Sequence, residues 1–395
     1  MPGTASRRHA AALTAGLFIV AYGTNVSTPF LLLYKERLGL SPSQTMAIFA
    51  AYVAGILATL MVAGPLSDRF GRRPVVLPMV ALSGVASLAM VLGRNDFALL
   101  LAGRCLLGVV SGGVLGVGAA WLFELLGPGQ EQRAAVTTTV VTFTGFGIGP
   151  LVSALFFWVL PAPLVVPFVV HAVATGIVVI FMLAIPETHP ASPGTPIRIS
   201  LGVPPRARRS FWIVVAPAAI WVFAFPSTSF ALFPVLVSDA LDGGEVAVAG
   251  AAGTLTAWAG LSSRPLVNRV GPRAALPVGM ILGFGGYLVG TISFATDIWP
   301  LVLIAAPLLG GAAGAITAGC LALLGTMADD RQRGAATSSF YLLAYPGMTM
   351  PVLITTLAVA SSMSFALTTV TFVSAVFAVG VVAVARSGTG SVVGT

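Results

Sequence analysis

Residues 64–73 read Gly-Pro-Leu-Ser-Asp-Arg-Phe-Gly-Arg-Arg, and residues 264–273 read Arg-Pro-Leu-Val-Asn-Arg-Val-Gly-Pro-Arg. The two stretches share a Pro-Leu pair, two arginines and a glycine at an offset of 200 residues. The same offset relates Arg133 and Gly147 to Arg333 and Gly347 further along the chain. The sequence therefore predicts two related halves, each with a short basic loop at the same place.

Apolar residues dominate the chain on both sides of these loops. Of the 395 residues, 57% are hydrophobic and 8% are charged, whereas soluble domains have about 25% charged residues. A spanning helix needs about 20 consecutive apolar residues, so the apolar runs predict an all-α membrane protein with twelve spans. These spans are expected near residues 10–33, 43–66, 75–93, 97–126, 134–159, 163–185, 211–237, 246–266, 274–295, 298–326, 335–359 and 363–385.

A polar segment at residues 187–210 separates the first six runs from the last six. Its prolines and arginines cannot continue a spanning helix; they are Pro190, Pro193, Pro196, Arg198, Pro204, Pro205, Arg206, Arg208 and Arg209. The predicted domains are an N-terminal six-helix bundle at 1–186, a cytoplasmic linker at 187–210 and a C-terminal six-helix bundle at 211–395. Repeats of this kind place a transport pathway at their interface.

The net charge of +8 follows topology and gives no sign of nucleic-acid binding. Placing the N-terminus in the cytoplasm puts all but four of the 20 basic residues inside, the exceptions being Lys35, Arg37, Arg94 and the embedded Arg104. This asymmetry predicts cytoplasmic termini in a bacterial inner membrane. Cys105 and Cys320 lie in apolar runs without metal-type spacing, so we expect no metal and no cofactor.

The loop pattern G-x-x-x-D-R-x-G-R-R at residues 64–73 resembles the signature of the major facilitator superfamily. The resemblance implies two pseudo-symmetric six-helix bundles and a gating role for the loop. Gly71 permits a sharp turn, and Asp68 can accept backbone hydrogen bonds at a neighbouring helix N-terminus. Glu124, at the end of the fourth span, matches an acidic residue that pairs with the basic cluster in the family. The gating candidates are Asp68, Arg69, Gly71, Arg72, Arg73, Glu124 and Arg133; alternatively, the arginines only anchor the loop at anionic headgroups.

The fifth span contains Gly145, Gly149 and Pro150 in a G-x-x-x-G-P pattern, similar to that of the drug:proton antiporters within the superfamily. Glycines four residues apart allow a partner helix to approach closely, and the proline bends the helix. Helix packing without export is the other interpretation. The sixth span ends in Ile185-Pro186-Glu187-Thr188, a family-like ending to which the sequence assigns no role.

The resemblance implies that spans 1, 4, 7 and 10 line a central cavity. Candidate substrate contacts are the polar and aromatic residues Tyr22, Asn25, Thr28, Arg104, Trp221, Phe225, Ser229, Tyr341 and Tyr345. Tyr22, Asn25 and Thr28 are predicted to share one helix face. Aromatic stripes also serve packing, and Arg104 faces either a polar cavity or the outer headgroups by snorkelling.

Few titratable groups lie within the spans, so proton coupling has only four candidates: Asp68, Glu124, Arg104 and His171. The sixth span is usually peripheral in the family, which favours His171 as a buried structural histidine. The sequence predicts a monomeric proton-coupled exporter of small lipophilic compounds. An importer on the same fold is the alternative, as is a receptor or membrane enzyme, although no catalytic motif supports an enzyme.

Overall fold

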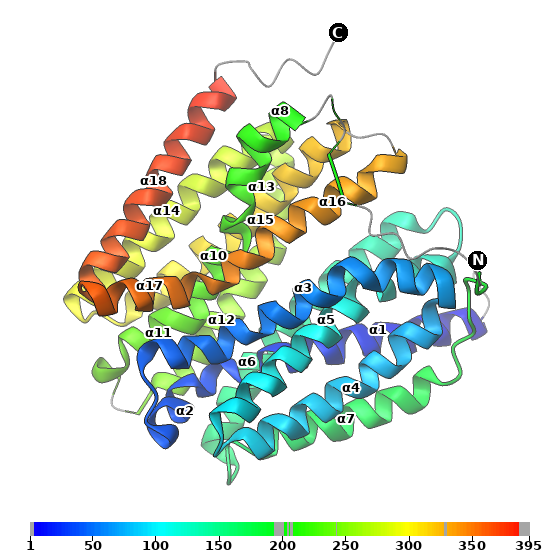
Figure 1. The fold of residues 1–395 in the computed structure, drawn as a ribbon, viewed down its shortest axis with the longest axis horizontal. Helices are drawn as coiled ribbons and strands as arrows, with labels where there is room; N and C mark the ends of the chain where they lie inside the picture. The colour runs from blue at the N-terminus through cyan, green and yellow to red at the C-terminus, as the bar shows by residue number, and fades with distance from the viewer. Residues whose placement is uncertain are drawn as a thin grey trace. The chain divides into compact units, whose positions relative to one another are not determined.

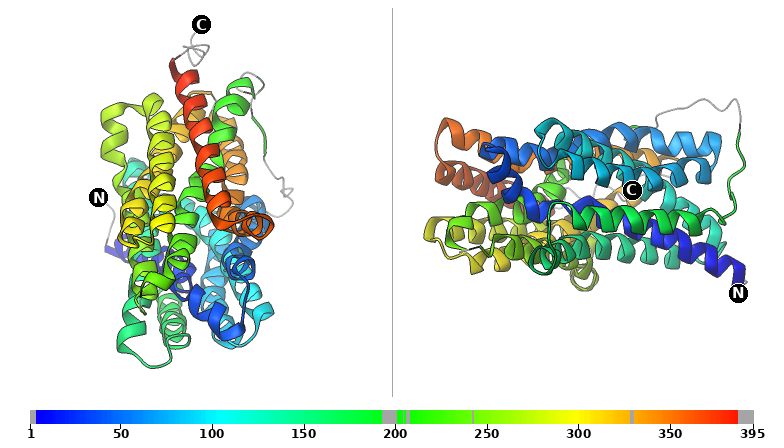
Figure 2. Two further views of the ribbon diagram at one scale, coloured as in Figure 1. Left: turned by 90° about the vertical axis from the view of Figure 1, so that its left-hand side faces the viewer. Right: turned by 90° about the horizontal axis from the view of Figure 1, so that it is seen from below.

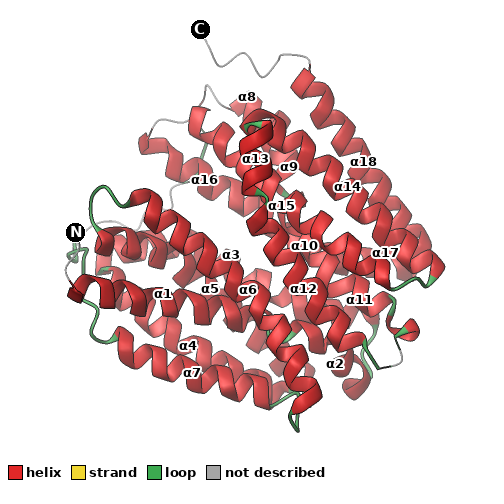
Figure 3. Ribbon diagram, turned by 180° about the vertical axis from the view of Figure 1, so that it is seen from behind, coloured by secondary structure: helices red, strands yellow, loops and turns green. Residues whose placement is uncertain are grey.

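The computed structural model describes residues 4–192, 201–203, 205, 208–241, 243–327 and 330–386. Within these ranges all regular structure is helical (Figure 3). Among the described residues, eleven helices are long and apolar enough to cross a membrane, and Val166–Met182 is a twelfth, shorter apolar helix. The predicted all-α fold with twelve spans is confirmed. Part of the predicted linker, including Pro193, Pro196, Arg198, Pro204 and Arg206, lies outside the described residues.

The chain divides into two compact units, the first comprising Met1–Ser41 and Ala47–Ile199 (Figure 1). In this unit α1 packs against α5, α6 and α7, and α4 lies between α5 and α7. The two further views in Figure 2 show these helices running alongside one another. The helices are α1 (Thr4–Asn25), α2 (Leu31–Leu38), α3 (Pro42–Phe70), α4 (Arg72–Gly93), α5 (Phe97–Leu126), α6 (Glu131–Val159) and α7 (Val166–Met182).

The second unit comprises Pro42–Met46 and Ser200–Thr395. In it α14 packs against α15 and α18, and α12 packs against α15. Its helices are α8 (Arg208–Ser210), α9 (Ala216–Ala219), α10 (Trp221–Ser227), α11 (Phe233–Leu236), α12 (Glu245–Ser262), α13 (Arg264–Val270), α14 (Pro272–Thr296), α15 (Pro300–Met327), α16 (Asp330–Ala344), α17 (Met350–Ala360) and α18 (Met363–Arg386).

Three spans depart from regular α-helix at places that matter for the site, and one of these departures is a 3₁₀ turn at Tyr345–Thr349 in span 11. Span 1 breaks after Asn25, and a 3₁₀ turn at Thr28–Phe30 leads into α2. Pro29 lies in the first turn of that 3₁₀ segment, where its fixed φ and missing N–H end a regular hydrogen-bond ladder. Span 7 contains π-helical turns at Phe211–Val215 and Thr228–Leu232. Such turns often mark functional positions in helices.

Candidate functional site

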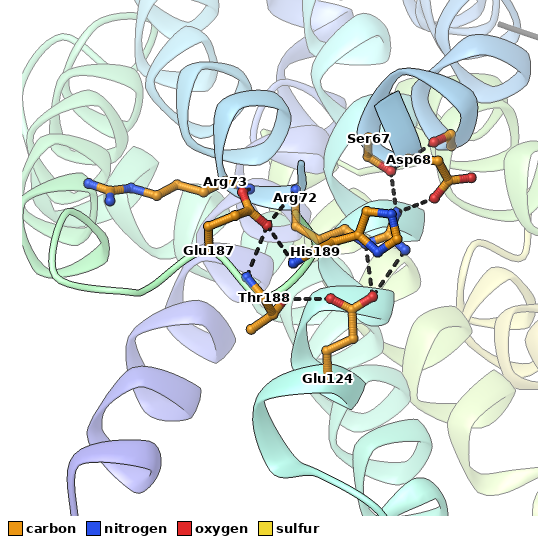
Figure 4. A network of polar contacts seen from close by, with 9 residues as sticks. Ser67, Asp68, Arg72, Arg73, Glu124, Glu187, Thr188 and His189 are labelled. Carbon is orange, nitrogen blue, oxygen red and sulfur yellow. Dashed lines mark hydrogen bonds and ion pairs between the residues drawn. The ribbon is translucent and has the colours of Figure 1, made fainter. Parts of the chain in front are cut away.

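A polar network surrounds Arg72 where the loop between α3 and α4 meets the end of α5 (Figure 4). Its guanidinium donates from Nη1 to Asp68 Oδ1 at 2.7 Å and to Ser67 Oγ at 2.5 Å. From Nε it donates to Glu124 Oε1 at 3.0 Å, and Nη2 lies 3.0 Å from the same oxygen. Glu124 Oε2 accepts a short hydrogen bond from Thr188 Oγ1. Arg72 thus links the end of α3 to the end of α5.

The two ion pairs of Arg72 differ in exposure. The Asp68 side chain is 55% exposed, whereas that of Glu124 is 25% and that of Arg72 is 12% exposed. Exposed pairs contribute about 0–1 kcal/mol because water and salt screen them. The Arg72–Glu124 pair is therefore the stronger tie, and the Asp68 pair can be broken and remade at little cost.

Glu187 forms the second part of this network, although no role was predicted for it. Its carboxylate accepts hydrogen bonds from the backbone N–H groups of Arg72 at 2.9 Å and Arg73 at 2.8 Å. It also accepts from the N–H groups of Thr188 at 3.0 Å and His189 at 2.9 Å. The first amides of a helix have no partner within it, so Glu187 supplies the cap of α4. Its negative charge also offsets two arginines at the positive end of the helix dipole.

The electrostatics of Glu187 follow from these bonds. Burial by itself favours the neutral carboxyl, but the N–H donors of His189, Arg72, Arg73 and Thr188 outweigh it and hold the pKa of Glu187 below its ordinary value of 4.5. The carboxylate is therefore ionised at neutral pH, and α4 keeps its cap.

Asp68 was expected to accept hydrogen bonds from backbone N–H groups. In the described contacts it binds Arg72 instead, and Glu187 accepts from the amides of α4.

Gly71 is required at the loop for two reasons. Its φ of +102° lies in a region that residues with a side chain rarely adopt, and a Cβ there would lie 2.5 Å from Glu187 Oε2.

The remaining arginines of the loop contact other groups. Arg73 Nη2 donates to Leu183 O at 2.8 Å, and the Arg69 guanidinium lies 5.2 Å from the Phe70 ring centroid. Arg133 is exposed, and the described contacts of Glu124 are with Arg72 and Thr188.

Arg104 lies inside the first unit with a side chain that is 1% exposed. It donates to the carbonyl oxygens of Thr24 at 2.5 Å, Phe49 at 3.2 Å and Ile48 at 3.3 Å. It neither snorkels nor presents a free guanidinium. Thr24 belongs to the last turn of α1, so the cation lies at the negative end of that helix dipole.

His171 is a buried structural histidine in this structure. Its Nε2 lies 3.0 Å from Ile19 O, which can only accept, so Nε2 carries the proton and donates. Its Nδ1 lies 2.6 Å from Ser87 Oγ and accepts from it in the neutral ring. The ring also packs against Gly23, where any Cβ would collide with it. Both ring nitrogens are therefore engaged, linking α1, α4 and α7.

The substrate candidates of span 1 do not share one continuous helix face. Tyr22 and Asn25 belong to α1, but Thr28 lies beyond its end in the 3₁₀ turn. Tyr22 is 7% exposed, and Asn25 Nδ2 donates to Phe146 O at 3.5 Å. The prediction that these three residues share one helix face is wrong because the helix is interrupted before Pro29.

In the second unit the aromatic candidates pack against one another. Trp221 stacks on Phe225 with ring centroids 5.1 Å apart, and both contact Tyr287. Ser229 Oγ lies 2.8 Å from the hydroxyl of Thr256. All these side chains are buried, so they form a core of this unit.

Tyr341 and Tyr345 are half-buried, with ring centroids 6.0 Å apart. Tyr345 lies beyond the end of α16, in a 3₁₀ turn, and stacks on Phe223 at 4.5 Å. The described aromatic contacts of these two tyrosines therefore also serve packing.

The glycines of α6 make the close helix contact that their spacing predicts. A Cβ on Gly145 would lie 2.8 Å from Ala21 Cβ and Phe18 O, and one on Gly149 would lie 2.5 Å from Tyr22 O. Pro150 lies inside the same helix and is buried. The pattern thus brings α6 onto α1 in the neighbourhood of the break in span 1.

Together these features define a membrane protein of the transporter class: twelve spans in two related bundles, with a basic loop tied to neighbouring helix ends. The sequence profile described as Major Facilitator Superfamily matches residues 13–289. The chain belongs to this superfamily.

Relatives and solved structures agree with that assignment. The chain is 28% identical to the Bacillibactin exporter of Bacillus subtilis (strain 168) over 159 residues, which are 38% of this chain and 40% of that protein. It is 33% identical to Multidrug resistance protein MdtL of Escherichia coli O81 (strain ED1a) over 162 residues, 40% of this chain and 39% of that protein. The matches thus span about two fifths of the length of these curated relatives.

Two solved structures share the fold at low identity. A POT family transporter in complex with 5-aminolevulinic acid gives a TM-score of 0.80 at 12% identity, covering 97% of both chains. A bacterial homolog of the human lysosomal transporter Spinster gives a TM-score of 0.70 at 14% identity, covering 100% of this chain and 95% of the other. At these identities the likeness concerns the fold alone.

Proposed function

We propose that this transporter is a proton-driven exporter of small lipophilic compounds that works by alternating access. The observation that carries the proposal is the Arg72 network, which joins helix ends through charged contacts. Its Arg72–Asp68 pair is exposed enough to open and close. The names of two relatives, a bacillibactin exporter and a multidrug resistance protein, support the direction of transport.

The site residues support a lipophilic cargo with little positive charge. The predicted contacts in spans 1 and 7 carry aromatic, hydroxyl or amide groups, and none is a carboxylate. A dicationic drug would lose its hydration without gaining an ionised partner there. A neutral or weakly polar compound loses little, so it is the cargo that this composition favours.

Proton coupling is best assigned to the carboxylates of the Arg72 network. His171 has both ring nitrogens engaged in the protein interior, and Arg104 donates to backbone carbonyls. Asp68 and Glu124 share one guanidinium, so protonation of either would weaken the tie. The positive-inside distribution of charge predicts a cytoplasmic position for this network, where a proton would be released during export.

Proteoliposomes with an imposed pH gradient test this function. A neutral lipophilic dye and a dicationic dye of similar size would be followed in parallel. We expect gradient-dependent movement of the neutral dye, in exchange for protons, and little movement of the dication. Preferential dication transport would overturn the cargo argument, and solute movement in the same direction as protons would make the protein an importer.

A further inference from the structure

The carboxylate of Glu124 uses its two oxygen atoms for different partners. Oε1 accepts from Arg72, whose Nε and Nη2 atoms both lie 3.0 Å away. Oε2 accepts from the hydroxyl group of Thr188. The Glu124 side chain is partly exposed, so it can exchange protons with water. One oxygen of this carboxylate thus faces a cation, and the other faces a hydroxyl that can rotate.

The segment that carries Thr188 is fixed against the end of α5. Pro186 O accepts from the indole Nε1 of Trp121 at 3.3 Å, and Trp121 lies on α5 three residues before Glu124. Glu187 is bound by four backbone N–H groups, one of which is that of Thr188. The end of α5 therefore contacts this segment at Pro186 and again at Thr188, which keeps the Thr188 hydroxyl beside Glu124.

A hydroxyl can reverse the direction of its hydrogen bond, whereas a guanidinium cannot. Arg72 has only donors, so a proton added to Oε1 of Glu124 would face two N–H groups and a positive charge. Thr188 has one O–H donor and two acceptor lone pairs. A proton taken from water by Oε2 can therefore be donated to Thr188 Oγ1 once the threonine O–H has rotated away. One O–H bond forms on Glu124, no bond of Thr188 breaks, and the hydrogen bond between them is kept in the reverse direction.

The second half builds the same turn without a carboxylate at this position. The glycine of the turn has a φ of +79° at Gly271 and +102° at Gly71. Leu324, a buried apolar residue, stands at an offset of 200 from Glu124. A loop of this shape therefore forms without such a carboxylate, and Glu124 is available for a role other than folding the loop.

Other charged and titratable groups near Glu124 decide what the experiment must control. The network in Figure 4 contains two further carboxylates, two arginines and one histidine, which are Asp68, Glu187, Arg72, Arg73 and His189. Residues without a described contact to Glu124 lie at the start of α1, the end of α3 and the start of α6; they are Arg7, Arg8, His9, Arg69, Glu131 and Arg133. Glu187 is occupied by backbone N–H groups. Asp68 and His189 are therefore the alternative proton acceptors within the network.

We propose that Oε2 of Glu124 takes up the coupling proton and that Thr188 is the positioning residue that sets how readily it does so. This inference deepens the proton-driven export proposed above and rests on it. While Thr188 donates, it stabilises the ionised carboxylate, which keeps its ion pair with Arg72. Once Oε2 is protonated, Glu124 is neutral, and Arg72 keeps only its exposed ion pair with Asp68. Proton uptake thus loosens the contact between α4 and the end of α5.

Exchange of the neutral dye by the full-length protein in proteoliposomes, measured against pH with equal pH on both sides, tests the role of Thr188. Thr188→Val keeps the volume of the side chain but removes the hydroxyl, so the ionised carboxylate loses a charged hydrogen bond. The midpoint of the pH profile should then move upward by about 0.5–1 unit. Thr188→Ser keeps a hydroxyl and should leave the midpoint in place. Thr296→Val, which removes an exposed hydroxyl bonded to its own helix in the second unit, is the matched control.

Infrared titration of the purified protein separates this inference from transport activity. The carboxyl C=O band that Glu124→Gln removes reports the protonation of Glu124 directly. Its midpoint should rise in Thr188→Val as in the transport profile, and the band should persist in Asp68→Asn and His189→Gln. If Glu124→Gln does not fold, the comparison of Thr188→Val with Thr188→Ser still decides the question.

Three results would overturn the inference: equal midpoints in Thr188→Val and Thr188→Ser, a pH response that His189→Gln abolishes, or a carboxyl band that Asp68→Asn removes and Glu124→Gln leaves. Any of these together with gradient-dependent transport of the neutral dye would leave the proposed function in place and move the coupling proton elsewhere. A band that shifts as expected in a protein that moves no dye would instead support the role of Thr188 and refute proton-driven export.

Discussion

Removal of the Glu187 carboxylate tests whether the Arg72 network is held by the cap of α4. Glu187→Ala leaves the amides of Arg72 and Arg73 without the acceptor that lies 2.9 and 2.8 Å away. Loss of a helix N-cap costs about 0.5–2 kcal/mol, and the upper part of that range is expected because two amides lose their acceptor together. A loss of about 1–2 kcal/mol corresponds to a factor of about 5–30 in the local equilibrium.

Hydrogen exchange measured by mass spectrometry on peptides covering residues 67–76 is the direct assay. We expect the amides of Arg72 and Arg73 to exchange about 5–30 times faster in Glu187→Ala, because the cap no longer holds them closed. Glu187→Gln should give a smaller effect, since it keeps an acceptor but loses the charge. Glu131→Gln, which alters an exposed glutamate bonded to Gly129 N, is the matched control.

The protection of these amides against exchange should depend on pH. The pKa of Glu187 lies below its ordinary value of 4.5, so its contribution is complete above pH 4.5 and is lost as the pH falls through the lower folded value. The parent and Glu187→Ala should therefore converge in loop protection under acid conditions. Unchanged exchange of these amides in Glu187→Ala at neutral pH would refute the capping argument.

Three further predictions concern the gate, the interior and helix packing. Asp68→Asn should leave the amount of folded protein in the membrane unchanged while reducing transport up to about fivefold, because the exposed Asp68–Arg72 pair contributes about 1 kcal/mol at most; equal losses of insertion and flux would make Asp68 structural. His171→Leu should lower the free energy of unfolding by about 1–3 kcal/mol, because it leaves buried polar groups unpaired, yet leave the pH profile of transport per folded molecule unchanged; a shifted profile would assign the coupling proton to His171. Gly149→Val should destabilise the protein by about 1–3 kcal/mol through overpacking, read from the thermal midpoint, whereas Gly176→Ala, which faces open space, should not; equal midpoints would contradict the close contact with α1.

The fold could be predicted from the sequence because each spanning helix is a continuous apolar run of residues. About 20 apolar residues followed by a polar loop suffice to place each span, and tertiary packing is not needed to read them. The span predicted at residues 97–126 coincides with α5, Phe97–Leu126. The breaks in span 1 and near Tyr345 had a local signal too, namely Pro29 and Pro346, although the sequence interpretation passed over both.

The site was only partly accessible, because its contacts join residues far apart in the chain. Arg72 and Glu187 are separated by 115 positions, and no spacing rule connects them. Sequence reasoning therefore assigned the helix-capping role to Asp68, the nearest carboxylate. It likewise missed Tyr287, which completes the aromatic core around Trp221. The charge of Arg104 was visible in the sequence, but the carbonyl groups that surround it depend on the packing of three helices.

Glu187 and Ser192 tie the start of the linker back to the first loop, since Ser192 N also donates to Arg69 O at 3.0 Å. This has a practical consequence for dividing the chain into two separately produced halves. A fragment ending at residue 186, the boundary that hydropathy favours, would discard the residue that completes its own basic loop. A cut placed beyond Ser192 would keep that fragment intact, and reassembly of function from the two pieces should succeed with the longer one and fail with the shorter.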